Sequence, residues 1–295
     1  MKRIIPLLLV ALLAVMVLGG CAQDQEPNQN QNQDQTQDQG QDNEQRNVLR
    51  VGMECAYAPY NWSQPTDANG AVPIFGSSDF AFGYDVMMAK FVADKLGYDL
   101  EIHMIDWDSL PMAVQSGAID IEIAGRSITA ERQMSFDFSS PYYYASIVSL
   151  VMADGPFGDA TGVSDLAGAV ATSQLNTVWY DVVLPQVPDV DMRPAMESAP
   201  AMLVALTSGA VELVVTDFPT ALAAVQVYPE LKLLDFTDSD DAFEVSDEQI
   251  NIGIMLAKGN TELLDKINEA LSELTVADFE RMMDEAIRVQ PLAVD

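Results

Sequence analysis

The residues best suited to binding chemistry lie in residues 119–132, where an arginine follows a predicted strand, a glycine and a helix start. Alternating isoleucines and acidic residues predict the strand, and Gly125 would let the backbone approach a partner closely. Thr129 is placed as a helix N-cap. A helix start favours anions, so Arg132 in the first turn is unexpected. A bound carboxylate would explain it, because Arg132 and the helix amides could both donate to it. An ion pair with a neighbouring acidic side chain is the alternative.

A near copy of part of this stretch occurs later in the chain. Residues 116–121 read Ser-Gly-Ala-Ile-Asp-Ile, and residues 208–213 read Ser-Gly-Ala-Val-Glu-Leu. Each copy follows an apolar helical run and continues as a strand, and the second strand ends at Asp217. Ligands of open parallel sheets bind beyond the carboxyl ends of strands. A zwitterion between two α/β lobes could therefore use Arg132 and Asp217, although Asp217 could also be only a helix N-cap.

Aromatic side chains follow other predicted strands. Tyr57 comes soon after the strand at residues 48–53, in a loop that could form one wall of a ligand site. For Tyr60 and Trp62 in the same loop, packing in the core is favoured. Trp107 lies between a strand end and a helix start, where it could face a ligand or cover the core.

Polar residues follow the strand at residues 169–172. The next five, Ser-Gln-Leu-Asn-Thr at residues 173–177, open a helix. The serine, asparagine and threonine of this stretch could donate to an anion or could simply cap that helix. Strands and helices alternate throughout, which predicts the α/β class.

The N-terminus has the pattern of a targeting segment. Residues 1–20 combine Lys2 and Arg3 with an apolar run that is short for a spanning helix. The run ends in Leu-Gly-Gly-Cys, which resembles a bacterial lipobox and implies cleavage before Cys21 and lipid, such as palmitate, on its thiol. An uncleaved anchor or plain secretion is the alternative. Residues 21–46 are rich in Gln, Asn and Asp, and predict a disordered tether.

Composition limits the possible partners. The net charge of −31 repels nucleic acid and anionic lipid, so neither is expected as a partner. With Cys21 carrying lipid, Cys55 has no disulfide partner. His103 is the only histidine, and it is not spaced with Cys55 as metal ligands are, so we expect no metal and no cofactor.

From residue 48 to the C-terminal helices, the chain resembles the extracellular solute-binding proteins of polar amino-acid ABC importers, family 3. Members have the type II periplasmic-binding fold. The resemblance rests on Tyr-Ala-Pro-Tyr at 57–60, Gly-Tyr-Asp at 83–85, Asp-Trp-Asp at 106–108, Ser-Gly at 116–117 with Asp120, Ala-Gly-Arg-Ser-Ile-Thr at 124–129 with Arg132, residues 136–143, and Ser-Gly at 208–209 with Asp217.

The resemblance implies a two-lobed α/β fold with two hinge crossings. Lobe 1 would comprise residues 47–145 and 247–295, and lobe 2 residues 146–246. The lobes would close on a free amino acid, and an ABC permease would receive it. We expect a monomeric binding protein rather than an enzyme, held by its lipid on the outer face of the cytoplasmic membrane.

The resemblance also implies roles for individual residues. Arg132 would hold the ligand α-carboxylate, helped by the Ser127 amide and by Thr177. Asp217 would accept the α-ammonium, together with the Gly125 carbonyl and the Ser127 hydroxyl. These contacts would bind any free amino acid.

The side-chain pocket is expected to set the choice of amino acid. Tyr57 and Trp107 would sandwich the ligand side chain, and Glu54 lies where lysine- and arginine-binding relatives carry an acid. Arg126 replaces the usual Met or Leu, and it either points to solvent or meets an acidic group. The family's usual Gly-Thr-Thr or Gly-Ser-Thr is Leu-Asn-Thr at residues 175–177. A basic amino acid is the expected ligand, with glutamine or another polar amino acid next.

Two other functions share this fold. A periplasmic cyclohexadienyl or arogenate dehydratase would need a general acid, for which Glu54 is the candidate in the cleft. A ligand-sensing ectodomain would need a later transmembrane helix and a signalling domain, and neither follows before Asp295.

Overall fold

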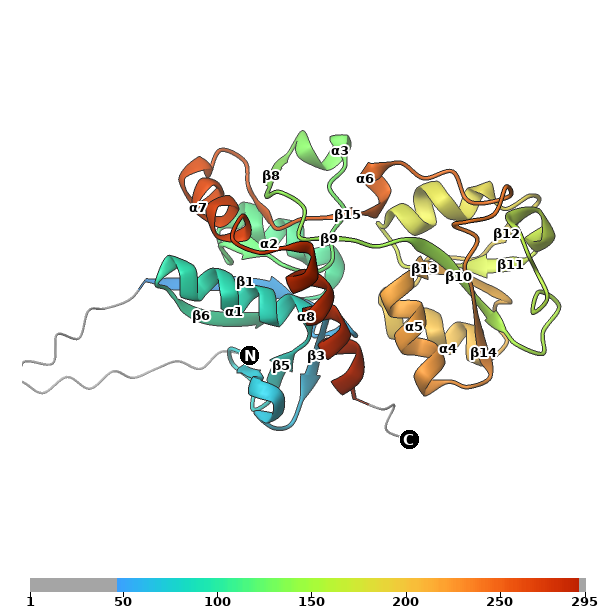
Figure 1. Ribbon diagram of the computed structural model, residues 1–295, viewed down its shortest axis with the longest axis horizontal. Helices are drawn as coiled ribbons and strands as arrows, with labels where there is room; N and C mark the ends of the chain where they lie inside the picture. The colour runs from blue at the N-terminus through green and yellow to red at the C-terminus, as the bar shows by residue number, and fades with distance from the viewer. Residues whose placement is uncertain (1–46, 292–295) are drawn as a thin grey trace, which may run out of the picture. The chain divides into compact units, whose positions relative to one another are not determined.

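The computed structural model describes residues 47–291 (Figure 1). The predicted signal peptide at residues 1–20, the lipidation site Cys21, the tether at residues 21–46 and the last residues, 292–295, lie outside the described part. Within residues 47–291, none of the helices combines the length and apolar character needed to cross a bilayer.

The first large sheet has the strand order β6-β1-β7-β16-β8. β6, β1 and β7 are parallel, and β16 runs antiparallel to both of its neighbours. Helices α1, α2, α7 and α8 lie around this sheet in Figure 1. The strands are β1 (Val48–Met53), β6 (Asp99–Met104), β7 (Ile121–Glu122), β8 (Phe136–Phe138) and β16 (Met255–Ala257); the helices are α1 (Tyr84–Leu96), α2 (Leu110–Ser116), α3 (Ala130–Gln133), α7 (Thr261–Leu271) and α8 (Val276–Val289).

The second large sheet repeats this plan, with the order β12-β11-β13-β10-β14. β12, β11 and β13 are parallel, and β10 is antiparallel to β13 and β14. The strands are β10 (Ile147–Met152), β11 (Val170–Thr172), β12 (Asp191–Met192), β13 (Leu213–Asp217) and β14 (Leu231–Leu234); the helices are α4 (Ala199–Thr207) and α5 (Phe218–Val227), with short helical turns at Val163–Leu166, Trp179–Val183 and Leu184–Gln186.

Two smaller sheets complete the fold. One has the order β2-β3-β5-β4, and the other pairs β9 with β15. The part of the molecule built on the first large sheet, together with the four-stranded sheet, is called the first half below, and the part built on the second large sheet is called the second half. The chain passes between the two large sheets twice, from β9 into β10 and back from β14 to β15 (Figure 1). The expected two-lobed α/β fold is confirmed. The remaining elements are β2 (Ala56–Tyr57), β3 (Asn61–Gln64), β4 (Val72–Pro73), β5 (Phe80–Phe82), β9 (Tyr143–Tyr144), β15 (Asn251–Ile252), α6 (Asp247–Ile250) and the turns Ala68–Gly70 and Trp107–Ser109.

The sequence repeat is also a structural repeat. Gly117 ends α2 and Gly209 follows α4, and each has a φ of 73°, a left-handed conformation that suits glycine. The acidic residue that follows each glycine binds the backbone at the start of the neighbouring strand. Asp120 accepts the N–H of Arg50 at 2.8 Å, and Glu212 accepts the N–H of the residue that opens β11 at 3.1 Å. The segment before each strand, β7 or β13, is therefore anchored to its neighbouring strand in the same way.

Residues 249–257, which resemble one alternating strand, form instead α6, β15 and β16. Gln249 accepts the Ser246 N–H at 2.6 Å, which stabilises the start of the short helix. Gly253 then separates the two strands at a tight contact, where an added Cβ would lie 2.7 Å from the Ile128 side chain.

Asp85 precedes an apolar helical run and is of a residue type that favours the helix N-cap, but it does not cap α1. Gly83 occupies the cap position, and Asp85 is fully buried in the first turn. Its carboxylate accepts hydrogen bonds from the Asn61 amide and the Tyr142 hydroxyl, both at 2.8 Å, and Tyr142 in turn accepts the Gly125 N–H at 3.2 Å. Burial raises the pKa of Asp85 to about 7, against the effect of these donors.

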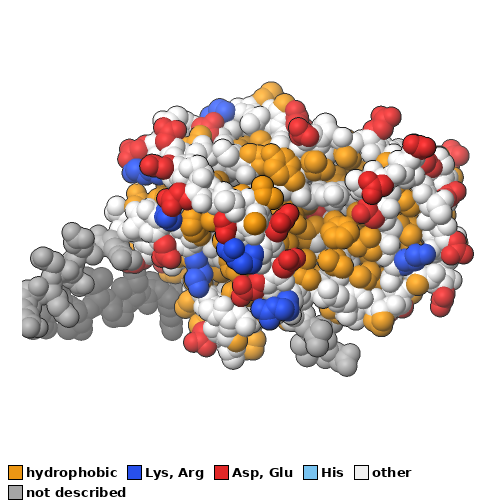
Figure 2. Space-filling view, in the orientation of Figure 1, with side chains coloured by type: hydrophobic (Ala, Val, Ile, Leu, Met, Phe, Trp, Pro, Cys, Tyr) orange, Lys and Arg blue, Asp and Glu red, His pale blue; other side chains and the backbone are white. Residues whose placement is uncertain are grey.

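Acidic side chains are scattered over both halves of the face shown in Figure 2, with apolar areas between them. This distribution agrees with the net charge of −31. On this face the acidic side chains are therefore spread over both halves rather than gathered in one area.

The substitution Asp85→Asn should destabilise the fold by about 1–3 kcal/mol, because asparagine has one acceptor oxygen for the two donors, Asn61 and Tyr142, and leaves one buried donor unpaired. Urea unfolding measures this change. Asp94→Asn, on the exposed side of the same helix, is the matched control and should change stability by less than about 0.5 kcal/mol. Equal losses in the two variants would contradict the structural role of Asp85.

The raised pKa of Asp85 also predicts how the stability of the fold depends on pH. In the folded state its pKa is about 7, above the ordinary value of 3.8, so the folded state holds a proton that the unfolded state releases between these values. The stability of the wild type should therefore fall as pH rises through this window. Asp85→Asn should show a shallower fall, and an unchanged slope would count against the raised pKa.

Candidate ligand-binding site

The carboxyl ends of strands from both large sheets meet at one small cavity. Glu54 follows β1, Gly125 follows β7, Gln174 follows β11, and β13 ends at Asp217. The cavity contains all the residues predicted to contact a ligand except Asp217, which touches one of them. Its lining consists of Glu54, Tyr57, Trp107, Ala124, Gly125, Ser127, Arg132, Gln174, Thr177, Val178 and Trp179.

Arg132 provides the positive charge of the cavity. Thr129 caps α3 as predicted and accepts the Arg132 N–H at 3.2 Å, which places the arginine in the first turn. The guanidinium donates to the carbonyls of Ser127 and Asn176, both at 2.8 Å. It forms no ion pair within residues 47–291. Burial and the charge of Arg126 lower the pKa of Arg132 to about 10, so it stays charged at neutral pH.

Asp217 provides the negative charge and is only 2% exposed. One carboxylate oxygen accepts the Thr220 N–H at 2.8 Å, so Asp217 is the N-cap of α5. The other oxygen accepts the hydroxyl of Tyr57 from the first half of the molecule. Burial raises the pKa of Asp217, with the Tyr57 and Thr220 hydrogen bonds opposing the shift. Asp217 thus acts as a helix cap and also contacts a cavity residue.

Tyr57 and Gly125 form one wall of the cavity. Tyr57 stacks on Tyr60, with ring centres 4.6 Å apart, and lies 6.3 Å from the ring of Trp179. A Cβ on Gly125 would lie 2.7 Å from the Tyr57 ring, and its φ is 66°. Glycine is therefore required there for both space and backbone conformation. Tyr60 and Trp62 are buried, in agreement with the favoured core role.

Thr177 and Ser127 use part of their hydrogen-bonding capacity within the protein. The Thr177 hydroxyl donates to the Gln174 carbonyl at 2.6 Å and accepts the Tyr180 N–H at 3.3 Å. Its side chain therefore caps the helical turn, which was the simpler of the two expectations. Ser127 is 8% exposed and pairs with Ile252 through its backbone.

Glu54 lies in the cavity and also lines a larger acidic opening beside it. Its carboxylate accepts two long hydrogen bonds from the Gln174 amide, at 3.3 and 3.4 Å. Burial raises the pKa of Glu54 to about 7, while Gln174 and Arg126 oppose the rise. The opening has a volume of about 480 Å³ and carries three further acids, Asp106, Asp108 and Glu197.

Arg126 does not line the cavity. It is 4% exposed and pairs with Glu122, which is completely buried. Of the two alternatives left open by the sequence, the acidic partner is therefore the one observed. The guanidinium also stacks on the ring of Trp107, with its carbon 3.6 Å from the ring centre.

The cavity is closed by polar contacts between its two sides. Its volume of about 10 Å³ is enough for about one water molecule. An amino acid can enter only if the two sides separate. The contacts are Tyr57 to Asp217, Gln174 to Glu54, Trp107 Nε1 to the Leu175 carbonyl, Asn176 to Asp108, and Arg132 to the Asn176 carbonyl.

Sequence reasoning did not assign Gln174, Val178, Trp179 or Ala124 to the site. Gln174 lies within the polar stretch that follows β11, so the strand-end rule could have included it. Val178 and Trp179 belong to the helical turn after that stretch. Their direction depends on a π-type turn, Trp179–Val183, which no residue pattern in the sequence announces.

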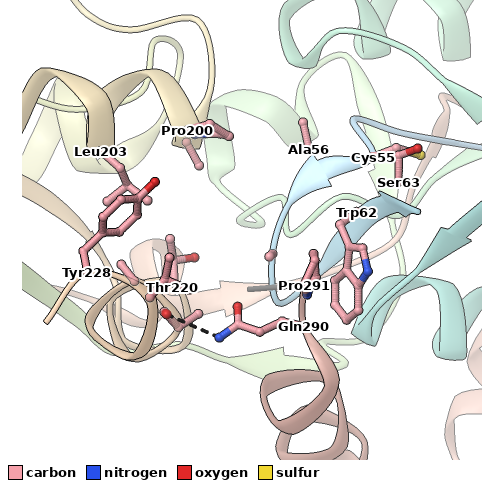
Figure 3. Close-up of a pocket in the computed structure, with 15 residues that line it drawn as sticks. Cys55, Ala56, Trp62, Ser63, Pro200, Leu203, Thr220, Tyr228, Gln290 and Pro291 are labelled. Atoms are coloured by element: carbon pink, nitrogen blue, oxygen red, sulfur yellow. Dashed lines mark hydrogen bonds between the residues drawn. The ribbon is translucent and has the colours of Figure 1, made fainter. Parts of the chain in front are cut away.

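A second cavity, of about 290 Å³, lies between the two halves near α4, α5 and the end of α8 (Figure 3). The dashed line marks the hydrogen bond from the Gln290 amide to the Ala223 carbonyl, 3.3 Å long. Its lining is mostly apolar, including Trp62, Leu203 and Tyr228, and contains no charged side chain. It therefore lacks the opposite charges of the first cavity. Within residues 47–291, no group of three His, Cys, Asp or Glu side chains is placed to hold a metal.

Comparisons with known proteins agree with this architecture. The L-cystine-binding protein TcyJ of Escherichia coli K12 is 27% identical over 232 residues, 78% of each chain. A substrate-binding protein of an amino acid ABC transporter from Streptococcus pneumoniae, bound to L-arginine, has a TM-score of 0.71 at 25% identity and covers 83% of this chain and 95% of that one. An ancestral arginine-binding protein bound to arginine has a TM-score of 0.64 at 31% identity, with coverages of 81% and 98%.

The family model of the bacterial extracellular solute-binding proteins, family 3, matches residues 49–284. This match spans both large sheets and all the residues of the cavity. The chain belongs to the bacterial extracellular solute-binding proteins of family 3.

Proposed function

We propose that this protein captures a free amino acid between its two lobes and delivers it to the permease of an ABC importer. The observation that carries the proposal is that Arg132, in α3 beyond the end of β7, and Asp217, at the end of β13 in the other large sheet, lie beside one closed cavity. Neither side chain forms an ion pair within residues 47–291. An α-amino acid carries the two opposite charges that would satisfy both.

The proposed contacts follow from the donors and acceptors at each charge. Arg132 has five N–H donors and uses two of its nitrogens on carbonyls, so it can still donate to an α-carboxylate. The Ser127 amide and Thr177 would assist. Asp217 would accept the α-ammonium in place of the Tyr57 hydroxyl, together with the Gly125 carbonyl and the Ser127 hydroxyl. Each is a charge-assisted hydrogen bond in a dry site, where such bonds are strong.

The side chain of the ligand would lie between Tyr57 and Trp107 and extend towards Glu54. Arg126 is neutralised by Glu122 and does not line the cavity, so it does not oppose a cationic ligand directly. The acidic opening next to Glu54 also favours a positive group. We therefore favour a basic amino acid, and place glutamine or another polar amino acid second.

Closure would couple binding to transport. The proposed lobes are residues 47–145 with 247–295, and residues 146–246, with the hinge at the two chain crossings. Ligand contacts to both lobes would stabilise the closed form, because ligand binding shifts a two-state equilibrium by its differential affinity. The permease would then recognise the closed form of a monomer.

The proposed attachment to the membrane uses the N-terminus. Cleavage before Cys21 and lipid on its thiol would hold the protein on the outer face of the cytoplasmic membrane. Residues 21–46 would act as a spacer. This location fits an extracellular solute-binding family.

An enzymatic function remains a second candidate because of Glu54. A buried carboxyl with a pKa of about 7 could act as a general acid in a dehydratase reaction. Incubation of the purified protein with prephenate or arogenate separates the two functions. Turnover would support the enzyme, whereas binding of an amino acid without turnover would support the importer.

A thermal-shift screen against the common amino acids tests the proposed function, because a ligand that binds only the folded state raises its stability. A basic amino acid should give the largest rise in melting temperature. If no amino acid shifts the transition, the proposal is wrong.

The charge clamp predicts that Arg132→Ala and Asp217→Ala each weaken binding by about two orders of magnitude or more. Removing one partner of a buried charge pair costs about 3–5 kcal/mol, and a tenfold change is about 1.4 kcal/mol. Calorimetry measures the affinity. Arg193→Ala and Asp191→Ala, which break an exposed ion pair, are the matched controls and should bind normally. Near-normal affinity in Arg132→Ala or Asp217→Ala would contradict the assignment of these two residues as ligand contacts.

Glu54 predicts a pH-dependent preference. Its pKa is raised to about 7 in the closed protein, so the ionised fraction falls about tenfold between pH 8 and pH 6. Affinity for L-arginine should fall accordingly, because its side-chain cation would pair with ionised Glu54. Affinity for L-glutamine should fall less, because its side chain is uncharged and it shares with L-arginine only the contacts to Asp217. Glu54→Gln should weaken L-arginine more than L-glutamine and remove the difference in pH dependence. An unchanged preference in this variant would refute the pocket assignment.

The proposed anchor predicts that Cys21→Ser abolishes labelling with palmitate and releases the protein from membranes. A chain that starts at Asn47 should bind its amino acid as tightly as the lipidated protein, because residues 21–46 offer almost nothing to bury. Loss of binding in the shortened chain would show that the tether contributes to the site.

A further inference from the structure

We propose that Arg126 is a positioning residue, which acts on ligand binding by holding Trp107 at the wall of the cavity. The inference rests on the proposed function and names one more residue for the same site. Arg126 and Glu122 together are called the buried pair below. They lie at and just after the end of β7, behind the cavity.

The buried pair needs an explanation beyond stability. Arg126 is 4% exposed and Glu122 is fully buried. Moving two charges out of water carries a desolvation penalty that often exceeds their attraction, and apolar residues of similar volume are frequently as stabilising. The remaining carboxylate oxygen of Glu122 has no hydrogen-bond partner in the part of the chain that the structure describes. Glu122 therefore depends on Arg126, and the pair as a whole is an inefficient way to fill a core.

The contacts of Arg126 with Trp107 supply that explanation. The guanidinium carbon lies 3.6 Å from the centre of the Trp107 ring, so the cation covers one face of the indole. One guanidinium nitrogen also donates to the Trp107 carbonyl at 3.3 Å. The Nε–H of Arg126 donates to the Glu122 carboxylate, which fixes the other part of the guanidinium. A planar group can stack, pair and donate at the same time, which a lysine ammonium cannot do.

Trp107 is the residue through which this restraint reaches the site. Its ring lines both the small cavity and the acidic opening. Its Nε1–H donates to the Leu175 carbonyl across the cavity at 2.9 Å, and Asn176 donates to the adjacent Asp108. A displaced indole would therefore remove a wall of the pocket and a contact that closes it.

The buried pair also lies within electrostatic reach of two proposed ligand contacts. The charge of Arg126 opposes the raised pKa of Glu54 and contributes to the lowered pKa of Arg132. It thus helps to keep Glu54 ionised. This effect is secondary to the geometry, because Glu122 carries the opposite charge beside Arg126.

Arg126→Lys tests the inference, because it keeps the charge and removes the stacked planar fork. Affinity for L-arginine should fall about tenfold, mainly through faster dissociation, because the indole of Trp107 would no longer be fixed at the cavity wall; a tenfold change is about 1.4 kcal/mol. Calorimetry and stopped-flow fluorescence measure these values. Arg50→Lys is the matched control, since Arg50 lies in the neighbouring strand β1 and its ion pair with Asp120 is partly exposed and outside the cavity. It should bind normally.

A double-mutant cycle separates positioning from other effects. Glu122→Gln with Arg126→Met removes both charges and avoids an unpaired buried acid. This change should weaken binding in the wild type but have little further effect in Trp107→Leu, because the residue it positions is gone. Additive losses would overturn the inference, and so would unchanged affinity in Arg126→Lys.

A readout without ligand distinguishes this inference from the proposed function. In a Trp62→Phe, Trp179→Phe background, Trp107 is the only tryptophan, because the chain has three. Arg126→Lys should increase quenching of its fluorescence by acrylamide, and Arg50→Lys should not. Unchanged quenching would overturn the positioning role. Absence of amino-acid binding by the wild type would instead overturn the proposed function and the role in binding built on it.

Discussion

A partly buried cation, Arg132, and a buried anion, Asp217, must lie beside one cavity without neutralising each other, and the rest of the site depends on this constraint. Arg132 is held by two carbonyls, and Asp217 by a backbone amide and the Tyr57 hydroxyl. These neutral partners stabilise each charge only in part, so burial lowers the pKa of Arg132 and raises that of Asp217. A zwitterionic ligand would supply the missing charge at both ends. The binding energy would thus come from charges that the empty protein already holds in place.

The two halves of the molecule contribute unequal parts to this arrangement. The first half supplies Arg132, Glu54 and the aromatic walls, whereas the second supplies Asp217 and the polar stretch after β11. The contacts across the cavity are single or paired hydrogen bonds, which contribute about 0.5–1.5 kcal/mol each between neutral groups and about 1.5–3 kcal/mol to charged groups. The proposed closure would be reversible, because it rests on these few bonds. The buried pair differs, because its two charges satisfy each other inside one half and can remain fixed while the halves move.

Much of the fold and of the candidate site could be predicted from short-range patterns. The repeated Ser-Gly-Ala units indicated two equivalent strands, and Arg132 and Asp217 stood out because each follows one of them. The direction of Arg126 could not be predicted, since it depends on an acid four positions earlier that is buried under the same strand end. Asp85 has the residue type of a helix cap, and its buried role could not be predicted for a related reason. Its partners Asn61 and Tyr142 are distant in sequence, and only the packed fold brings the three together.

Calorimetry with modified ligands tests the central claim most directly. L-arginine should bind with one site per protein, whereas its N-acetyl derivative lacks the ammonium that Asp217 would accept, and its methyl ester lacks the carboxylate that Arg132 would hold. The side chain is the same in all three ligands, so Glu54 and the aromatic walls are tested equally. The account predicts that either modification weakens binding by about two orders of magnitude or more. Comparable affinity for L-arginine and either derivative would contradict it.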